Sequence, residues 1–529
     1  MTDFFNKKTA FMSFFIMIAV QMLCYNYIDY LRMEPRSIHS WRQSDCLSFI
    51  INFYNGRTTF LEPGVSNLGP TGDGKVASDF PIIQYTVAQI WKVTGISTPV
   101  YRLINLGFLV LGLFYIYKLY AYWFKERYWL ALLATGLIFT STLLAYYGPT
   151  PLSDIQALGL SCAGFYYFIL WLDNKHLRNF IAFVFLFAFA GLLKMSSAFI
   201  FAIALAYWLI RLLFGSEESK KELFSIRIVM GLLLPFIPWS LWYVYGAYYN
   251  TIHPNNYFLI GIAPIWIVQD IYIPEVLSLF KKDVLPIAFN PLFLSFLGMV
   301  LITSFTLQIR SFFKEVYLQR LIPVLILLCY LILFFQVFGE HDYYLINMLP
   351  VLVILVGLCT KMILERFPEF FNYKIVQIGL LIIVVVLTHE TAVFTRARIQ
   401  MKGWGFDSLV LTPERKDYFR WNSWHDRSQY EDLEGIKEQT LDSIGLTKDQ
   451  KVLCLGDATI NRSLFLLNRV GYTSFRQEMD KIDEFIDFNK EKGLHYLIVI
   501  DWNNLPKEKL APYLKNKVYE KGTVSIFKL

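Results

Sequence analysis

The chain has 529 residues, of which 55% are hydrophobic, 18% are aromatic and only 17% are charged. A soluble globular protein carries about 25% charged residues, so this composition excludes an ordinary soluble fold for most of the chain. The net charge of +7 is explained by basic loops between apolar runs, and it gives no support to a nucleic-acid-binding function.

Apolar runs of roughly 20 residues, which are long enough to cross a bilayer as helices, recur through most of the chain. The first run begins near Phe11, and bulky residues follow it where a signal peptide would have a small-x-small cleavage site. We therefore expect it to be retained as the first helix. The sequence predicts about eleven transmembrane helices, at about 8–29, 103–124, 128–147, 152–172, 178–194, 196–214, 227–248, 288–308, 318–338, 345–364 and 374–395.

The distribution of Lys and Arg predicts the orientation of these helices. Loops on the side of the N-terminus are basic, with Lys125, Arg127 and Lys220 as examples, whereas the short turns at 147–153 and 338–344 on the other side carry neither residue. Basic loops stay in the cytoplasm. An odd number of spans then places the C-terminal part of the chain outside the cytoplasm.

Two segments on the outer side are too long to be simple turns. Residues 30–100 contain helix-like stretches at 41–54 and 81–93, and residues 249–287 contain an aromatic tract. Segments of this kind usually lie along the membrane surface as interfacial helices. We assign both to a transmembrane domain at 1–395.

From about Ala397 the sequence becomes charged and soluble in character. The short apolar runs 451–456 and 496–501 are typical of strands between helices, and 518–528 alternates as a closing strand would. We therefore expect a small periplasmic α/β domain at 396–529. Its LGDATINRS segment lacks the glycine spacing of a dinucleotide fingerprint, so we expect no nucleotide site there.

The polar residues near the outer ends of the spans are the candidates for chemistry. Ionisable groups at membrane depth are costly and tend to mark function. In the predicted topology the strongest candidates all fall on the outer side, which favours one site over scattered charges. The five segments are His39-Ser40-Trp41-Arg42-Gln43-Ser44-Asp45, Arg102, Pro149-Thr150-Pro151-Leu152-Ser153-Asp154, Lys194 and Glu340-His341-Asp342-Tyr343-Tyr344.

Each candidate also has a purely structural explanation. Asp45 could be a helix-terminal charge, and Asp154 follows Pro and Ser at a helix start, where a carboxylate caps free N–H groups. Lys194 could extend its ammonium to the membrane interface. Arg102 could anchor a helix end, and His341 with its two tyrosine neighbours could belong to an aromatic belt. The functional interpretation depends on the joint placement of these residues.

The first outside loop also carries a family resemblance. The stretch HSWRQSDCLSFIINFYNG, followed by ASDFPIIQY and YRLINLGFLVLG, resembles the bacterial GT-C glycosyltransferases, which include the protein O-mannosyltransferases and the lipid A aminoarabinose transferase. Together with the later EHDYYLINMLP, it is similar to a subgroup with an HSWRQ-x-D pattern. The resemblance covers about residues 1–395 and implies a GT-C-type, all-α membrane domain. The C-terminal domain does not share it.

The resemblance implies transfer of a sugar from a polyprenyl-phosphate carrier on the non-cytoplasmic face, with a first-loop carboxylate at the catalytic centre. Many members have an acidic pair there, whereas Ser44 precedes Asp45, so this loop offers fewer oxygens to a divalent metal. A leaving phosphate gains charge and needs cations nearby. The assigned roles are catalytic for Asp45 and Asp154, donor-phosphate binding for Lys194, His341, Arg102 and Tyr344, and other places in the site for His39, Arg42 and Tyr343.

The predicted function is therefore an inverting glycosyltransferase of the bacterial inner membrane, with its active site on the periplasmic side. Its partners would be a polyprenyl-phosphate-linked donor, a glycan, lipid or protein acceptor, and membrane lipid. The sequence identifies no cofactor, and a divalent metal is left open. A transporter or flippase of lipid-linked saccharides and an O-antigen polymerase or ligase are the alternatives.

Overall fold

The computed structural model describes residues 6–254, 257–258, 261–307, 315–339, 341–422 and 428–529. Contacts within the chain define two compact units. The first, here the membrane unit, comprises Met1–Leu31, Arg102–Tyr243 and Gly261–Thr412. The second, here the loop–sheet unit, comprises Arg32–Tyr101, Val244–Ile260 and Pro413–Leu529.

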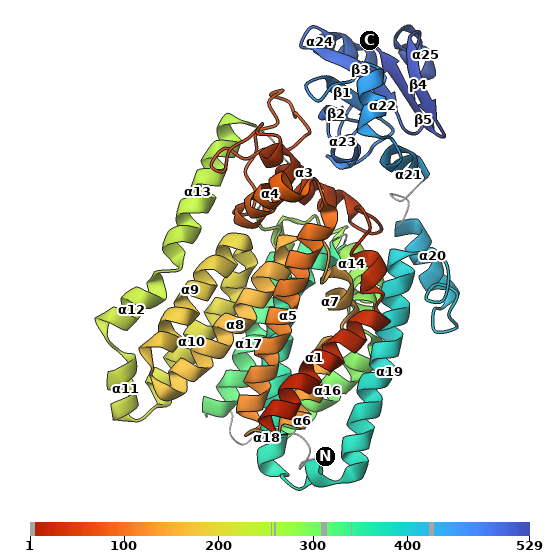
Figure 1. Ribbon diagram of the computed structural model, residues 1–529. Helices are drawn as coiled ribbons and strands as arrows, with labels where there is room; N and C mark the ends of the chain where they lie inside the picture. Colours follow the sequence, from red (N-terminus) through yellow and green to blue (C-terminus); the bar gives the residue numbers. More distant parts are fainter. Residues whose placement is uncertain (1–5, 255–256, 259–260, 308–314, 340, 423–427) are drawn as a thin grey trace. The chain divides into compact units, whose positions relative to one another are not determined.

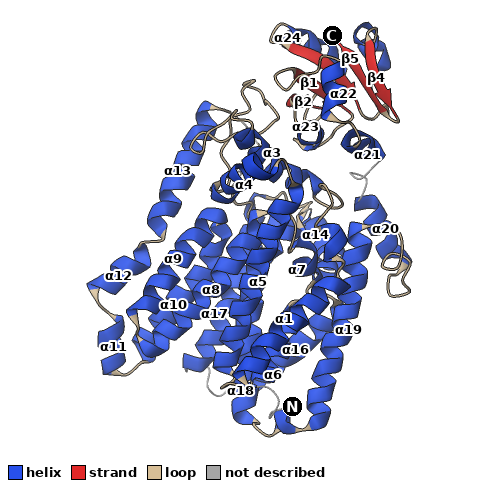
Figure 2. Cartoon of the chain, in the orientation of Figure 1, coloured by secondary structure: helices blue, strands red, loops and turns tan. Residues whose placement is uncertain are grey.

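The membrane unit is built of helices (Figure 1, Figure 2). Their apolar side chains suit a lipid environment, and helices satisfy their own backbone hydrogen bonds there. Two short 3-10 segments that matter below are η1 Met195–Ser197 and η6 Asp342–Met348. The helices that lie wholly or mostly in this unit are α1 Lys7–Cys24, α2 Tyr27–Tyr30, α5 Thr98–Trp123, α6 Tyr128–Ile138, α7 Thr142–Tyr147, α8 Ser153–Asn174, α9 Leu177–Leu193, α10 Ala198–Phe214, α11 Glu217–Leu223, α12 Ile226–Leu233, α14 Ile273–Leu279, α15 Leu285–Ala288, α16 Pro291–Thr306, α17 Glu315–Leu333, α18 Leu349–Arg366 and α19 Lys374–Ile399. Helix α13, Phe236–Ile252, is shared between the two units.

Among the described residues, seven helical segments are long and apolar enough to cross a membrane, and a pair bent by 94° would make an eighth. Every predicted span overlaps one of these segments or one of three shorter apolar helices. The chain is therefore a multi-pass membrane protein, while the count of eleven spans stays a prediction. The seven segments are Lys7–Cys24, Thr98–Trp123, Ser153–Asn174, Met195–Phe214, Ile226–Ile252, Asp342–Arg366 and Lys374–Ile399; the bent pair is Ile273–Ala288 with Pro291–Leu307; the shorter helices are Tyr128–Ile138, Leu177–Leu193 and Tyr317–Leu333.

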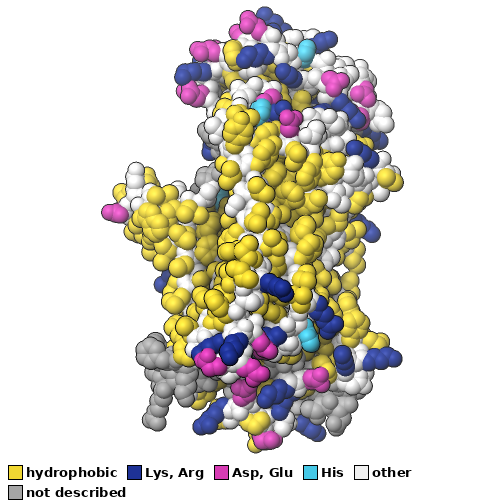
Figure 3. Space-filling view, turned by 90° about the vertical axis from the view of Figure 1, so that its left-hand side faces the viewer, with side chains coloured by type: hydrophobic (Ala, Val, Ile, Leu, Met, Phe, Trp, Pro, Cys, Tyr) yellow, Lys and Arg dark blue, Asp and Glu magenta, His cyan; other side chains and the backbone are white. Residues whose placement is uncertain are grey.

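Side chains on the outside of the membrane unit match this assignment. In the view of Figure 3, hydrophobic side chains cover the middle of the unit, and Lys, Arg, Asp and Glu gather at its lower end. Large apolar side chains are more than half exposed on several helices. In water such a surface would be a liability, whereas in a bilayer it faces lipid. Examples are Ile181, Phe185, Leu213, Ile237 and Leu241.

One predicted span, 128–147, is interrupted. Helix α6 ends at Ile138, and the Ser141 hydroxyl accepts a hydrogen bond from Leu144 N at the start of α7. The interruption frees backbone carbonyls, and neighbouring side chains bind them. The Tyr25 hydroxyl donates to Phe139 O at 3.0 Å, and the Thr391 hydroxyl donates to Thr140 O at 2.5 Å. A break at this depth is tolerated because protein groups replace the missing helical bonds.

In the loop–sheet unit the predicted strands are present, and the closing segment forms two strands joined by a tight turn. Strands β1 and β3 correspond to the two predicted apolar runs, and β2 is an additional short strand. The sheet order is β2-β1-β3-β5-β4, with β1 parallel to both neighbours and β5 antiparallel to both of its own. The strands are β1 Lys451–Leu455, β2 Val470–Thr473, β3 Leu494–Val499, β4 Lys517–Lys521 and β5 Val524–Lys528. The helices of this unit are α3 Ser40–Tyr54, α4 Ile82–Thr94, α20 Pro413–Asn422, α21 Ser428–Glu434, α22 Glu438–Ser443, α23 Arg462–Leu467, α24 Ile482–Lys490 and α25 Lys507–Leu510.

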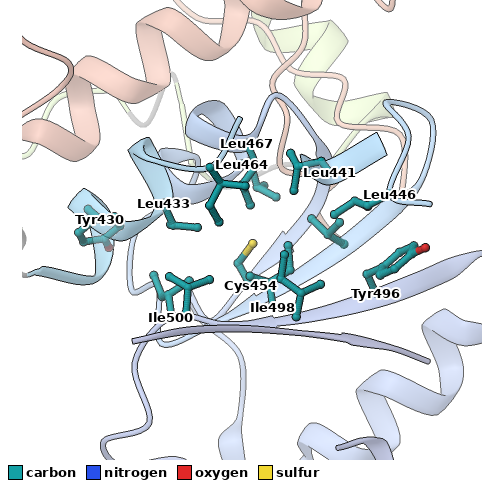
Figure 4. Close-up of a cluster of buried hydrophobic side chains, with 14 residues drawn as sticks. Tyr430, Leu433, Leu441, Leu446, Cys454, Leu464, Leu467, Tyr496, Ile498 and Ile500 are labelled. Atoms are coloured by element: carbon teal, nitrogen blue, oxygen red, sulfur yellow. The ribbon is translucent and has the colours of Figure 1, made fainter. Parts of the chain in front are cut away.

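Apolar side chains cover both faces of this sheet. On one face Cys454 and Ile498 from neighbouring strands pack below Leu464 and Leu467 of α23 (Figure 4). On the other face α24 and Leu68, from the loop between α3 and α4, complete a second cluster. Full burial of a leucine or isoleucine side chain contributes about 1.5–3 kcal/mol, so these clusters stabilise the unit.

The loop between α3 and α4 extends the sheet at β2. Leu68 N donates to Gly471 O at 2.8 Å, Gly471 N donates to Ser66 O at 3.0 Å, and the pairing is parallel. A Cβ at residue 471 would lie 1.8 Å from Val452 O, so only glycine fits this crossing of strands. By these contacts the loop and the C-terminal strands form one folded unit. The domain limits inferred from sequence, 1–395 and 396–529, stay a prediction.

The predicted sidedness can be checked with fused reporters. A reporter fused after Leu529 should be active outside the cytoplasm, and one inserted near Glu218 in α11 should be active inside. The reason is the excess of Lys and Arg in the loops on the side of α11. An alkaline phosphatase and a fluorescent-protein fusion at each place would measure both sides. The reverse pattern would contradict the periplasmic placement of the site.

Candidate functional site

The first candidate residues lie on α3 of the loop–sheet unit. Helix α3 follows His39, whose backbone has a left-handed φ of 57°, and apolar side chains then alternate with small polar ones. Residues 43–53 are all buried, so this helix is internal to its unit. The predicted helix-like stretch is therefore confirmed. Burial also places Asp45, a charged residue, in a nearly water-free environment.

Asp45 is fully buried, and its two carboxylate oxygens have different surroundings. Oδ1 accepts a hydrogen bond from Asn461 Nδ2 at 2.9 Å. Oδ2 lies 3.9 Å from Nη1 of Arg42, one turn earlier, and accepts no hydrogen bond from any described residue. Arg42 is also 3.9 Å from Asp79, so its charge is shared between two carboxylates. A buried oxygen of this kind is a feature of reactive acids more than of structural ones.

The pKa of Asp45 is raised from its usual value near 3.8 to about 6. Burial is the main cause because it disfavours the charged form. The charge of Arg42 and the hydrogen bond from Asn461 lower the pKa again, and the buried Asp457 raises it slightly. A carboxyl with a pKa near 6 is mostly ionised at pH 7 and is a better proton acceptor than an ordinary aspartate.

The N-terminal end of α3 is held by the C-terminal part of the chain. Arg462, itself buried, donates to Ser40 Oγ and to Pro35 O, both at 3.0 Å. Its guanidinium also lies 3.9 Å from the centre of the Tyr430 ring. The planar fork of arginine can satisfy several acceptors at once, which makes this a rigid attachment.

A second polar cluster lies in the membrane unit, where α8, η1 and η6 meet. Asp154, in the first turn of α8, accepts a hydrogen bond from Asn347 Nδ2 at 2.8 Å. Its other oxygen lies 3.6 Å from Nζ of Lys194, the residue at which α9 ends. The Lys194 ammonium is 5.5 Å from the centre of the Tyr344 ring. The N-cap residue of α8 is Leu152, which makes no side-chain capping bond, and the capping role considered for Asp154 stays a prediction.

An ion pair at the end of α19 borders this cluster. Arg398 Nη2 lies 2.5 Å from Asp342 Oδ2, and the Tyr147 hydroxyl donates to Asp342 Oδ1 at 2.5 Å. The Arg398 guanidinium also stacks on the Tyr146 ring, 4.2 Å from its centre. Asp342 and Arg398 are both buried. This pair fixes the start of η6, on which Tyr343 and Tyr344 lie.

The remaining candidates have well-defined neighbours. Arg102 is fully buried over the ring of Tyr30, at 4.7 Å, and its Nη1 donates to Pro149 O at 3.4 Å. His341 stacks beside the rings of Tyr343 and Tyr344, at 5.6 and 6.3 Å. His39 meets the edge of the Trp41 ring. Glu340, also part of the predicted segment, lies outside the described residues.

The structure thus groups the candidates into two sets. His39, Arg42 and Asp45 lie in the loop–sheet unit, where Arg42 and Asp45 face each other at 3.9 Å. In the membrane unit, one cluster consists of Asp154, Lys194 and Tyr344. The Tyr344 ring links His341 and Tyr343 to this cluster. Arg102 contacts the loop that precedes α8. Among the described residues no three His, Cys, Asp or Glu side chains are arranged to hold a metal ion.

Similar proteins are found by comparison with solved structures. No family model and no curated protein sequence matches the chain. The crystal structure of ArnT from Cupriavidus metallidurans in the apo state matches with a TM-score of 0.59 at 12% identity, over 97% of both chains. The chain has the fold of ArnT. The structure of that protein bound to undecaprenyl phosphate matches over the same shares, with a TM-score of 0.58.

A third structure, the arabinofuranosyltransferase AftD from Mycobacteria, matches 97% of this chain and 39% of its own, with a TM-score of 0.48 at 11% identity. The ArnT match confirms the predicted fold class, a helical membrane domain with a small C-terminal sheet. The narrower HSWRQ-x-D subgroup stays a prediction.

Several residues of these clusters are not among the sequence-based candidates. Asn461 and Arg462 belong to the LGDATINRS segment, which the sequence presents only as a failed match to a nucleotide fingerprint. A polar run, Asn461 at the N-cap followed by Arg462 and Ser463, at the start of an otherwise apolar helix is the signal that could have indicated them. Asn347 and Arg398 give no such signal, because a single amide or a last-turn arginine is common at helix ends.

Proposed function

We propose that the chain is an inverting GT-C glycosyltransferase that moves a sugar from a polyprenyl-phosphate carrier to an acceptor at the periplasmic face of the bacterial inner membrane. The observation that carries the proposal is Asp45, a buried carboxyl with a pKa of about 6 and one oxygen held by Asn461. The fold of ArnT, a protein seen with undecaprenyl phosphate bound, supports a lipid-linked donor.

The proposed step is a single displacement. Oδ2 of Asp45 takes the proton of the acceptor hydroxyl, and the acceptor oxygen forms a bond to the anomeric carbon. The bond from that carbon to the carrier phosphate breaks, and the phosphate leaves with the electron pair. General-base assistance of this kind contributes typically 10²–10⁴-fold to the rate. A carboxyl with a pKa near 6 has the driving force to assist while remaining ionised at neutral pH.

The leaving phosphate gains negative charge, which we propose is met by Lys194. The pairing of Lys194 with Asp154 supports a fixed position for the ammonium. Asp154 would then act through Lys194, and not as a second base. Tyr344 and His341, next to this ammonium along η6, are proposed to line the donor site, and Arg102 to hold the loop at Pro149 beside it.

Membranes of a strain that lacks this chain contain both the unused donor and the acceptor, so they provide an assay in which neither compound has to be identified beforehand. Purified protein added to these membranes should convert a polyprenyl-phosphate sugar into polyprenyl phosphate, as measured by mass spectrometry of extracted lipids. A transporter would leave the lipid chemically unchanged. An O-antigen-type polymerase or ligase would release a polyprenyl diphosphate instead. Either of these two results would refute the proposal.

A further inference from the structure

The loop between β1 and α23 is built around a buried carboxylate, Asp457. Its Oδ1 accepts hydrogen bonds from the Tyr430 hydroxyl at 2.9 Å and from Thr459 N at 2.8 Å, and its Oδ2 accepts one from Ser463 N at 2.9 Å. Asp457 is fully buried. Such a network holds the loop in one conformation and presents its tip, Asn461, in a fixed place.

The contacts of Asn461 determine how its amide is oriented. An ionised carboxylate can only accept a hydrogen bond, and a backbone N–H can only donate one. Asn461 Nδ2 faces Asp45 Oδ1 at 2.9 Å, whereas its Oδ1 accepts from Asn67 N at 2.9 Å and from Ser48 Oγ at 3.2 Å. The amide therefore links the α/β strands, α3 and the loop strand at residues 66–68, and it has no alternative orientation that satisfies all three.

We infer that Asn461 is a positioning residue for the transfer reaction: it fixes Asp45 Oδ1 and leaves Oδ2 as the oxygen that meets the acceptor. This inference rests on the proposed function, because it needs Asp45 to be the base. It also gives the C-terminal α/β segment a role. That segment supplies part of the surroundings of the reacting carboxylate, and it does so from a position 416 residues away in sequence.

The groups around Asp45 predict how its pKa changes when one of them is replaced. Arg42 on the same helix and Asn461 from the α23 loop favour the charged form, whereas Asp457 and burial oppose it; Asp79 draws part of the Arg42 charge away. Removal of the Asn461 amide takes away a hydrogen bond to the ionised carboxylate. The pKa of Asp45 must then rise from about 6, because a stabilising contact of the charged form is lost.

The test is the pH dependence of kcat/KM for Asn461→Ala, measured by the lipid conversion assay on the deletion-strain membranes. The acid limb of this profile is the range in which kcat/KM falls because Asp45 becomes protonated. Its midpoint, near pH 6 in the wild type, should move upward by about one pH unit. Activity relative to the wild type would then fall about fivefold further at pH 6 than at pH 8. Asn461→Ser, which keeps a small polar group in the loop, should show the same shift if the alanine variant does not fold.

Asn55→Ala is the matched control. Asn55, at the other end of α3, donates to Asn468 Oδ1 at 2.8 Å, so its replacement removes a contact with the same C-terminal segment without touching Asp45. The acid limb of this variant should coincide with that of the wild type. A shift of equal size in Asn55→Ala would assign the effect to a loosened junction and overturn the inference.

The two proposals fail in different ways. If Asp45→Asn is inactive but folded Asn461→Ala keeps the wild-type acid limb, the inference about Asn461 is wrong and Asp45 remains the base. If Asp45→Asn turns over at the wild-type rate, Asp45 is not the base, and the role of Asn461 falls with it.

Discussion

Asp45→Asn should lower the rate of sugar transfer by about two orders of magnitude or more, measured as kcat with the donor at saturation. Asparagine keeps the size of the side chain and can still accept the hydrogen bond from Asn461, but it cannot take a proton from the acceptor. The donor affinity should change little, because the base acts on the acceptor hydroxyl. Loss of kcat with an unchanged donor affinity is the pattern of an interaction made only in the transition state.

The same variant should be at least as stable as the wild type at neutral pH. The pKa of Asp45 is raised to about 6 in the folded protein, so the folded state favours the neutral carboxyl. Ionisation costs stability as the pH rises from about 4 to above 6, on the order of 3 kcal/mol once complete. Asp45→Asn removes that cost. The difference in thermal stability between the variant and the wild type, measured by thermal unfolding in detergent, should therefore grow in favour of the variant from pH 5 to pH 8.

An acid elsewhere in the same loop provides the control. The Asp73 side chain is 33% exposed and contacts Thr71 and His253, neither of which belongs to α3. Asp73→Asn should retain near-normal turnover and gain no stability at neutral pH. If Asp73→Asn loses as much activity as Asp45→Asn, the loop is sensitive to charge in general, and Asp45 has no special role.

The membrane helices were predictable because lipid imposes a simple rule on sequence. A span needs about 20 apolar residues, and each of the eleven predicted segments overlaps an apolar helix of the structure. Helices α3 and α4 and strands β1 and β3 were also predicted, since each has a local apolar pattern. Strand β2 was not, because four residues that include Gly471 resemble a loop.

The polar pairings could not be predicted in the same way. Asp45 and Asn461 are 416 residues apart, and no periodicity connects them. Lys194 was assigned to the donor phosphate from its place at a helix end, while its partner Asp154 was assigned to catalysis or capping; their contact at 3.6 Å is visible only in three dimensions. The predicted placement on one side of the membrane selected these residues as candidates, whereas packing determines which charges meet.

Lys194→Met is the second variant for which we expect a large effect. Loss of a charge aimed at a leaving phosphate in a water-poor site costs about 2–4 kcal/mol of transition-state stabilisation, which is about 30- to 1000-fold in kcat/KM. The single substitution also leaves Asp154 buried without its cation. Breaking a buried pair in this way destabilises a protein by about 3–5 kcal/mol, so lost activity alone would not distinguish the two roles.

The double variant Asp154→Asn/Lys194→Met separates them. Without either charge, the buried site is neutral, Asn347 can still hydrogen-bond to residue 154, and thermal stability should return to near the wild-type value. The transfer rate should stay as low as in Lys194→Met, because the leaving phosphate still lacks its cation. Recovery of both stability and turnover in the double variant would mean that Lys194 serves only to neutralise Asp154, and the donor phosphate would have to be bound by other residues.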